Sequence, residues 1–180
     1  MKQTILASLL AAAALAPVAS FASDGTITFN GSITGQTCTI SVNGGSASAS
    51  VTLPQVSASA LSTVGTKAGQ KPFVIALTNC STKSGGARAL FEVGSGVDTT
   101  TGRLFNTATG ATAAKGVEIG LATTSGTDIL VNGVATQPQT FVTIDATGSA
   151  TLNYLAQYVA TGTVTAGTTS SSVTYSIEYQ

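Results

Sequence analysis

The segment SVTYSIEYQ (residues 172–180) is typical of a β-strand that runs to the end of the sequence. Its apolar residues alternate with polar ones, as in a strand with one buried face: Val173, Tyr175, Ile177 and Tyr179. Sheets normally protect an edge strand with charges, proline or a further strand, and the only charge here is Glu178. We therefore expect a sheet that stays open beside this strand.

Most of the remaining sequence also predicts strands. We expect them at residues 37–42, 49–56, 71–80, 87–94, 102–108, 116–123, 139–146 and 150–161, with a hairpin over 128–136. Pro54 marks an irregular point or an edge, and Asn132-Gly133 predicts a type I′ hairpin turn. Residues 57–65 predict a short helical turn or a loop. Short strands with Gly, Asn and Ser turns, without a convincing long helix, repeat or linker, indicate one antiparallel β-sandwich.

The N-terminus has the pattern of a secretory signal peptide. Lys2 precedes an apolar run at residues 5–16, and Pro17 ends that run. Small residues then occupy the positions that a signal peptidase requires for a cut after Ala22. The run is too short to span a membrane as an anchor. We expect a signal peptide at residues 1–22, and the alternative is a retained membrane anchor.

The composition argues against catalysis and against nucleic-acid binding. Only 8% of residues are charged, with 7 basic and 7 acidic side chains, so there is no electrostatic footprint for a polyanion. The absence of histidine removes the commonest general base and metal ligand. The acidic residues show no pair at a suggestive spacing: Asp24, Glu92, Asp98, Glu118, Asp128, Asp145 and Glu178. We expect no enzyme activity, no cofactor and no metal.

The two cysteines are Cys38 and Cys80. In a secreted chain, two cysteines most simply form one disulfide. A metal site would need more ligands than this sequence supplies. Closing the loop between them would stabilise the fold by about 4 kcal/mol in the chain-entropy model.

The segment GTITFNGSITGQTC (residues 25–38) also resembles a strand, but with a gap in its apolar face. Ile27, Phe29 and Ile33 alternate on one face, and the position between the last two is Gly31, which has no side chain to bury. One alternative is an ordinary first strand packed on its own core. Because the other end of the chain lacks a neighbouring strand, we favour a strand that completes another copy of the protein.

With these two ends, the sequence resembles the subunits of chaperone–usher pili, the type 1 and P fimbrial protein family of Gram-negative bacteria. The resemblance covers the whole mature chain and is carried by DGTITFNGSITGQTC (24–38), by Cys80, and by YLAQYVATGTVTAGTTSSSVTYSIEYQ (154–180) with its penultimate Tyr179. It implies an incomplete immunoglobulin-like sandwich that lacks its C-terminal strand. In this family a periplasmic chaperone fills the gap first, and the N-terminal arm of a neighbouring subunit replaces it during assembly through an outer-membrane usher.

The resemblance also implies roles for individual residues. Residues 23–35 would be the donor-strand arm and 36–180 the pilin domain. Within the arm, Ile27, Phe29 and Ile33 would insert into the groove of the next subunit and Gly31 would be the family's notch glycine. The last strand would contact the chaperone and then the donor through Val173, Tyr175, Ile177, Tyr179 and Gln180. The arm before the cysteine looks shorter than that of type 1 major subunits.

The sequence therefore predicts a structural subunit of a chaperone–usher fimbria, exported through the periplasm to a surface fibre used in adhesion. An arm together with an open groove favours the repeating shaft position. A minor adaptor pilin is one alternative, and a secreted monomeric β-sandwich that binds a carbohydrate or host ligand is another. A two-domain tip adhesin would need a receptor-binding domain for which the mature chain leaves no room.

Overall fold

The structure is a computed structural model that describes residues 25–31, 33, 35 and 37–180. The predicted signal peptide, residues 1–22, lies outside the described residues. The chain divides into two units, one ending at Ile33 and one running from Thr34 to Gln180. Within the described part of the chain, no helix is long and apolar enough to cross a membrane.

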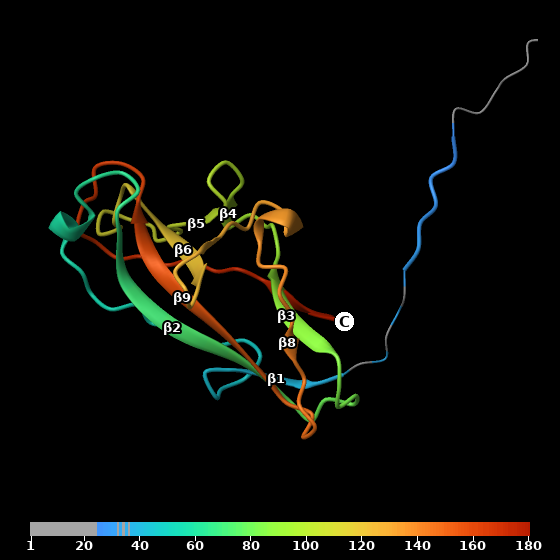
Figure 1. Cartoon of the computed structure of the whole chain (residues 1–180). Helices are drawn as coiled ribbons and strands as arrows, with labels where there is room; N and C mark the ends of the chain where they lie inside the picture. Colours follow the sequence, from blue (N-terminus) through green and yellow to red (C-terminus); the bar gives the residue numbers. More distant parts are fainter. Residues whose placement is uncertain (1–24, 32, 34, 36) are drawn as a thin grey trace, which may run out of the picture. The chain divides into compact units, whose positions relative to one another are not determined.

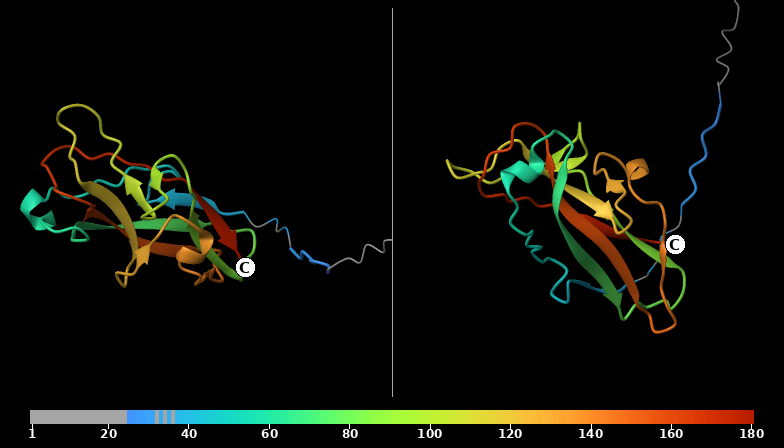
Figure 2. Two further views of the ribbon diagram at one scale, coloured as in Figure 1. Left: turned by 90° about the horizontal axis from the view of Figure 1, so that it is seen from above. Right: turned by 60° about the vertical axis from the view of Figure 1, so that its left-hand side comes forward.

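The second unit is built from two β-sheets (Figure 1). Among the described residues, the larger sheet has seven strands in the order β1-β2-β9-β6-β5-β4, with β7 paired to β6. Its strands are β1 (Thr39–Val42), β2 (Lys67–Thr78), β4 (Val97–Asp98), β5 (Arg103–Phe105), β6 (Val117–Thr123), β7 (Asp128–Ile129) and β9 (Ala150–Ala160). The long strands β2 and β9 lie side by side and twist together, as Figures 1 and 2 show.

The smaller sheet contains the last strand of the chain. Its order is β10 (Tyr175–Tyr179), β3 (Gly86–Phe91) and β8 (Val142–Thr143). The connections contain the short 3-10 helices η2 (Ala58–Leu61) and η3 (Val134–Thr136). Among the described residues every strand pair is antiparallel, and an isolated parallel bridge joins Ala113 to Thr168. The predicted antiparallel sandwich is confirmed.

The core lies between the two sheets because successive side chains of a strand point to opposite faces, so one face of each sheet is turned inward. In β2, Phe73, Ile75 and Leu77 are buried while their neighbours in sequence are more exposed. Phe91 of β3 meets Tyr154 of β9 edge to face, with the two ring centroids 5.2 Å apart. The two sheets are thus joined by aromatic packing as well as by aliphatic side chains.

One disulfide joins the start of β1 to the end of β2. Cys38 and Cys80 are bonded to each other, with their Cα atoms 4.0 Å apart. Beside it, the Thr37 amide donates to Ser81 Oγ at 3.0 Å and the Ser81 amide donates to the Thr37 carbonyl at 2.8 Å. The predicted disulfide is confirmed.

The predicted hairpin over residues 128–136 is wrong. Only Asp128–Ile129 forms a strand, β7, and Val134–Thr136 forms the helix η3. The backbone φ of Gly133 is 172°, which is extended and not the positive φ that a type I′ turn needs. Val131 is fully buried and its amide donates to the Gly102 carbonyl, so tertiary packing holds this segment away from hairpin geometry.

Candidate functional site

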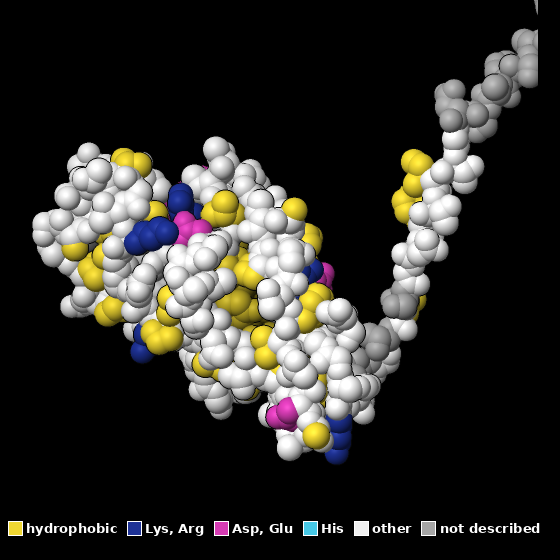
Figure 3. Space-filling view, viewed as in Figure 1, with side chains coloured by type: hydrophobic (Ala, Val, Ile, Leu, Met, Phe, Trp, Pro, Cys, Tyr) yellow, Lys and Arg dark blue, Asp and Glu magenta, His cyan; other side chains and the backbone are white. Residues whose placement is uncertain are grey.

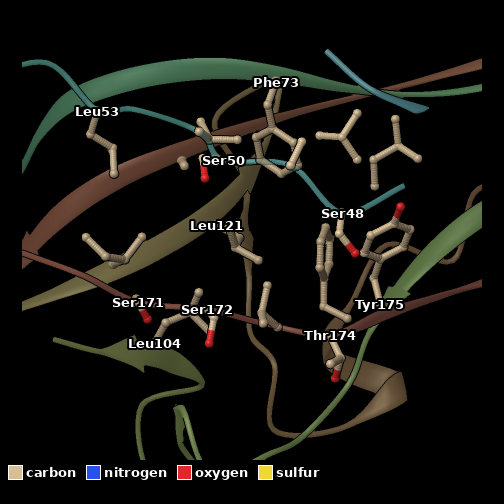
Figure 4. A pocket seen from close by; sticks show the side chains of 18 of the residues that line it. Ser48, Ser50, Leu53, Phe73, Leu104, Leu121, Ser171, Ser172, Thr174 and Tyr175 are labelled. Carbon is tan, nitrogen blue, oxygen red and sulfur yellow. The ribbon is translucent and has the colours of Figure 1, made fainter. Parts of the chain in front are cut away.

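A long groove runs beside β10 and the residues that precede it. One wall is the segment 47–53, and the other is the segment 169–177. The volume between them is about 870 Å³. Figure 4 shows Ser50 and Leu53 coming from one wall and Ser171, Ser172 and Thr174 from the other. The floor belongs to the core and is formed by Phe73, Ile75, Phe91, Leu104, Ile119, Leu121, Ala156 and Tyr158.

The groove exists because β10 is paired along one edge only. Its register with β3 places Ile177 opposite Ala89. The other edge faces the groove, and among the described residues no strand pairs with it. The backbone groups along that edge are therefore available to another strand.

The wall 47–53 corrects the prediction of a strand at residues 49–56. Val51 and Leu53 of this segment pack against the core, but the segment belongs to no β-ladder. A ladder needs a partner within hydrogen-bonding distance, and the open groove separates this segment from β10. The alternating sequence pattern correctly predicts which side chains face the core. The backbone forms no ladder because no strand among the described residues lies beside it.

The predicted apolar face of the last strand does pack against the core. Its members are all partly buried: Val173, Tyr175, Ile177 and Tyr179. The Tyr175 hydroxyl donates to the Ala47 carbonyl at 2.7 Å and so joins the two walls at one end of the groove. Burial raises the pKa of the Tyr175 and Tyr179 hydroxyls above their usual value. Gln180 extends the pairing, since its amide donates to the Gly86 carbonyl at 2.9 Å.

The outer face of β10 carries the charge that the sequence places near the open edge. Glu178 lies opposite Arg88 and forms an ion pair with it at 2.6 Å. Arg88 also donates to the Pro138 carbonyl at 3.1 Å and lies 4.8 Å from the centre of the Phe141 ring. Because the Glu178 carboxylate pairs with Arg88 on the neighbouring strand β3, it does not place a charge at the edge of β10 that faces the groove. On the face shown in Figure 3, charged side chains stand in small scattered groups and form no basic patch.

A second pocket adjoins the end of the groove and was not predicted from the sequence. Its volume is about 310 Å³, and it shares Tyr158 and Thr169 with the groove. Leu61 from η2, Val117 and Val164 form its apolar side. The only sequence signal for it is Leu61, an isolated apolar residue in a segment predicted as a turn.

The side chains predicted to enter a neighbouring molecule are almost fully exposed. The exposed fractions are 80% for Ile27, 88% for Phe29 and 103% for Ile33. A Cβ atom built on Gly31 would meet no atom within 4 Å. Their predicted role as a donor strand stays a prediction.

The structure brings together two acidic residues that the sequence analysis left apart. Glu118 is buried and accepts a hydrogen bond from Thr101 Oγ1 at 3.0 Å, and it also interacts with Asp98. Burial raises the pKa of Glu118, whereas the Thr100 amide lowers the pKa of Asp98. Within the described part of the chain, no three His, Cys, Asp or Glu residues lie close enough to hold a metal ion.

Residues 53–180 match the family model of the type-1 fimbrial protein FimA. The chain belongs to this family. It is 46% identical over 170 residues to the major fimbrial subunit SMF-1 of Stenotrophomonas maltophilia, an alignment that covers 92% of this chain and 98% of that protein. It is 40% identical over 173 residues to the F17 fimbrial protein of Escherichia coli, covering 93% and 94% of the two chains.

Solved structures of fimbrial proteins have the same fold. A Burkholderia pseudomallei antigen and type I fimbria protein superimposes with a TM-score of 0.56 at 30% identity, over 80% of this chain and 95% of that one. The P pilus rod subunit PapA superimposes with a TM-score of 0.55 at 23% identity, over 87% and 99%. The fimbrial protein described here is thus an immunoglobulin-like pilin sandwich and a structural subunit of an extracellular fimbrium, reached by export through the periplasm.

Proposed function

We propose that this fimbrial protein is the repeating shaft subunit and that it polymerises by accepting the N-terminal arm of another copy in the groove beside β10. The observation that carries the proposal is the unpaired edge of β10 along an apolar groove of about 870 Å³. The occupant is the arm segment 25–35, whose apolar side chains are exposed in the free chain.

The dimensions of the arm and the groove agree. At roughly 3.3 Å per residue, the wall 169–177 spans about 30 Å and the arm segment 25–35 about 36 Å. An extended arm is therefore long enough to run the whole groove. Strand addition would pair the free backbone groups of β10, which is a known mode of peptide recognition.

The chemistry of the arm also fits an apolar groove. Burying Ile27, Phe29 and Ile33 would contribute about 1.5–3 kcal/mol for each side chain. Gly31 would let the backbone approach the groove closely at one point, since it carries no Cβ. The remaining side chains of the arm alternate with these and would face away from the groove.

Each copy carries both an arm and a groove, so every subunit can donate to one neighbour and accept from another. Such a head-to-tail contact does not close on itself and propagates into a fibre. This supports a shaft position, as does the similarity to the major fimbrial subunit SMF-1. The similarity to structural subunits also supports a protein without enzymatic activity.

A periplasmic chaperone and an outer-membrane usher are the proposed assembly partners. Before assembly, the groove would expose a continuous apolar surface, which in a free protein promotes aggregation. A chaperone that inserts its own strand between the two walls would cover that surface until the arm of the next subunit replaces it. Tyr175, Ile177 and Tyr179 lie on the strand that would form this contact, and Gln180 directly follows it.

The proposal is tested with a variant that lacks residues 25–35. The variant should fold and bind chaperone but form no fibres, because it has no strand to donate. A synthetic peptide of residues 25–35 should bind its groove and raise its melting temperature, whereas a matched peptide with Phe29→Asp should not. Fibres of normal length from the deletion variant would overturn the proposal, and a stable chaperone-free monomer would favour a secreted ligand-binding protein instead.

A further inference from the structure

The chain contains three Asn-Gly pairs, and they differ in structure although the two residue types are the same. An asparagine followed by glycine is the sequence most prone to spontaneous deamidation, because glycine has no side chain to hinder attack by its own backbone nitrogen. The sequence alone therefore ranks the pairs as equal. They are Asn30-Gly31 in the arm, Asn43-Gly44 after β1 and Asn132-Gly133 before η3.

Two of the three asparagines are held by hydrogen bonds. Asn43 Oδ1 accepts from the backbone N–H of Val74 at 2.8 Å, and the backbone N–H of Asn43 donates to the Val74 carbonyl at 2.9 Å. Asn132 Nδ2 donates to the Thr99 carbonyl at 3.4 Å, and Asn132 Oδ1 lies 3.0 Å from Thr136 Oγ1, whose single proton it shares with the Leu130 and Gly133 carbonyls. These contacts oppose the side-chain rotation that brings Cγ onto the following nitrogen.

The described residues place no such restraint on the third pair. Asn30 and Gly31 are exposed, and a Cβ atom on Gly31 would meet nothing within 4 Å. Between described residues, no hydrogen bond of the Asn30 side chain is present. Its amide is therefore free to turn toward the Gly31 nitrogen.

We propose that Asn30-Gly31 is a deamidation site that is open in the unassembled subunit and is closed when the arm enters a groove. The closing of the site by assembly rests on the function proposed above, whereas its openness in the unassembled subunit does not. In a paired strand, the extended backbone fixes the Gly31 nitrogen away from Asn30 Cγ. Because Asn30 alternates with Phe29 and Gly31, its side chain would face away from the groove, so an inserted arm accommodates the intact amide.

The reaction needs only water. The Gly31 nitrogen, after losing its proton to solvent, attacks Asn30 Cγ; the Cγ–Nδ2 bond breaks, ammonia leaves and a succinimide ring forms. Water then adds to one of the two ring carbonyls and breaks its bond to nitrogen, which yields either aspartate or isoaspartate at position 30. No atom changes its oxidation state, and no oxidant or cofactor is required.

The isoaspartate product would disable the arm. It inserts a methylene group into the main chain at position 30, and a strand whose register shifts turns its side chains to the wrong face. Phe29 and Ile33 could then no longer point into the same groove together. A subunit that stays unassembled would thus lose its ability to donate a strand, whereas an assembled subunit keeps its arm intact.

The test compares assembled fibres with subunits that have been dissociated by heat and kept dilute. Both samples are incubated at mildly alkaline pH and digested, and the peptides with each Asn-Gly pair are quantified by mass spectrometry. We expect Asn30 to convert well before Asn43 and Asn132 in the free subunit, and to remain asparagine in the fibre. A free subunit in which Asn30 converts no faster than the other two would overturn the proposal, whatever the mode of assembly.

The Asn30→Gln variant serves as the matched control, because it keeps the amide while ring closure becomes far slower. Aged wild-type subunits should lose incorporation into fibres, and equally aged Asn30→Gln subunits should retain it. Equal conversion of Asn30 in fibres and free subunits would refute the protection by assembly. The function proposed above is judged separately, by the ability of the variant without residues 25–35 to form fibres.

Discussion

Phe29→Ala separates the stability of the fibre from the stability of the subunit. Phe29 is 88% exposed in the free chain, so its truncation removes almost no buried surface from the folded subunit. If the arm fills the groove of a neighbour, the same substitution removes a buried aromatic side chain from the contact between subunits. The effect should therefore appear in assembly and not in folding.

The expected loss follows from the transfer of the ring into the groove. Full burial of a Phe side chain contributes about 1.5–3 kcal/mol, and truncation of a buried Phe to Ala costs about 3–5 kcal/mol when a cavity remains. A loss of about 3 kcal/mol corresponds to a dissociation constant more than one hundred times larger, since about 1.4 kcal/mol is a factor of ten. We expect variant fibres to dissociate at a clearly lower temperature than wild-type fibres.

Fibres are heated stepwise and separated on denaturing gels, and the temperature at which multimers become monomers is recorded. The melting temperature of the isolated subunit is measured in parallel. Thr28→Ala is the matched control, because Thr28 lies on the opposite face of the arm and should leave the dissociation temperature unchanged. An unchanged dissociation temperature for Phe29→Ala, or an equal drop in the melting temperature of the subunit, would refute the reasoning.

Three further predictions concern the sandwich itself. Replacing both Cys38 and Cys80 by Ser should lower the free energy of unfolding by about 4 kcal/mol in the chain-entropy model; urea titration checks this, and an unchanged midpoint would contradict it. Gln137 donates to the Phe91 carbonyl at 2.7 Å and accepts from the Phe91 amide at 2.9 Å. Gln137→Leu leaves both buried groups unpaired and should cost about 2–5 kcal/mol; a melting temperature equal to wild type would show that these bonds do not matter. Burial raises the pKa of Glu118 above its usual value of 4.5, so the folded state favours the protonated carboxyl more than the unfolded chain does. Its contribution to stability is fully present below pH 4.5 and is lost as pH rises toward the folded pKa. Glu118→Gln should therefore be more stable than wild type at neutral pH, with the difference vanishing in acid; a gain that is the same at every pH would count against this.

The strands that could be predicted are those with a continuous apolar run, as at 71–80, or with clear alternation, as at 116–123. The runs at 71–80, 116–123 and 150–161 correspond to β2, β6 and β9, which bury one or both faces in the larger sheet. The predicted disulfide needed only the count of cysteines and an oxidising compartment. In each case the information lies within a short stretch of sequence.

The predictions that failed depend on neighbours that are distant in sequence. The hairpin over 128–136 was displaced because Val131 enters the core and bonds to Gly102. The segment 49–56 has the side-chain pattern of a strand, but no strand of the described chain pairs with it. The contact between Asp98 and Glu118 forms because β4, β5 and β6 lie side by side, which no spacing in the sequence reveals.

The sequence by itself predicted an open sheet edge beside SVTYSIEYQ (residues 172–180) and an apolar strand pattern around Ile27, Phe29 and Ile33. Both predictions depend on alternation between nearest neighbours along the chain, which is a local property. Only the tertiary structure decided where the groove runs and what forms its floor. Phe73, Leu104 and Ile119 come from three different strands, and the order of strands in a sheet is fixed by packing between distant segments, since each buries its apolar face only against the others.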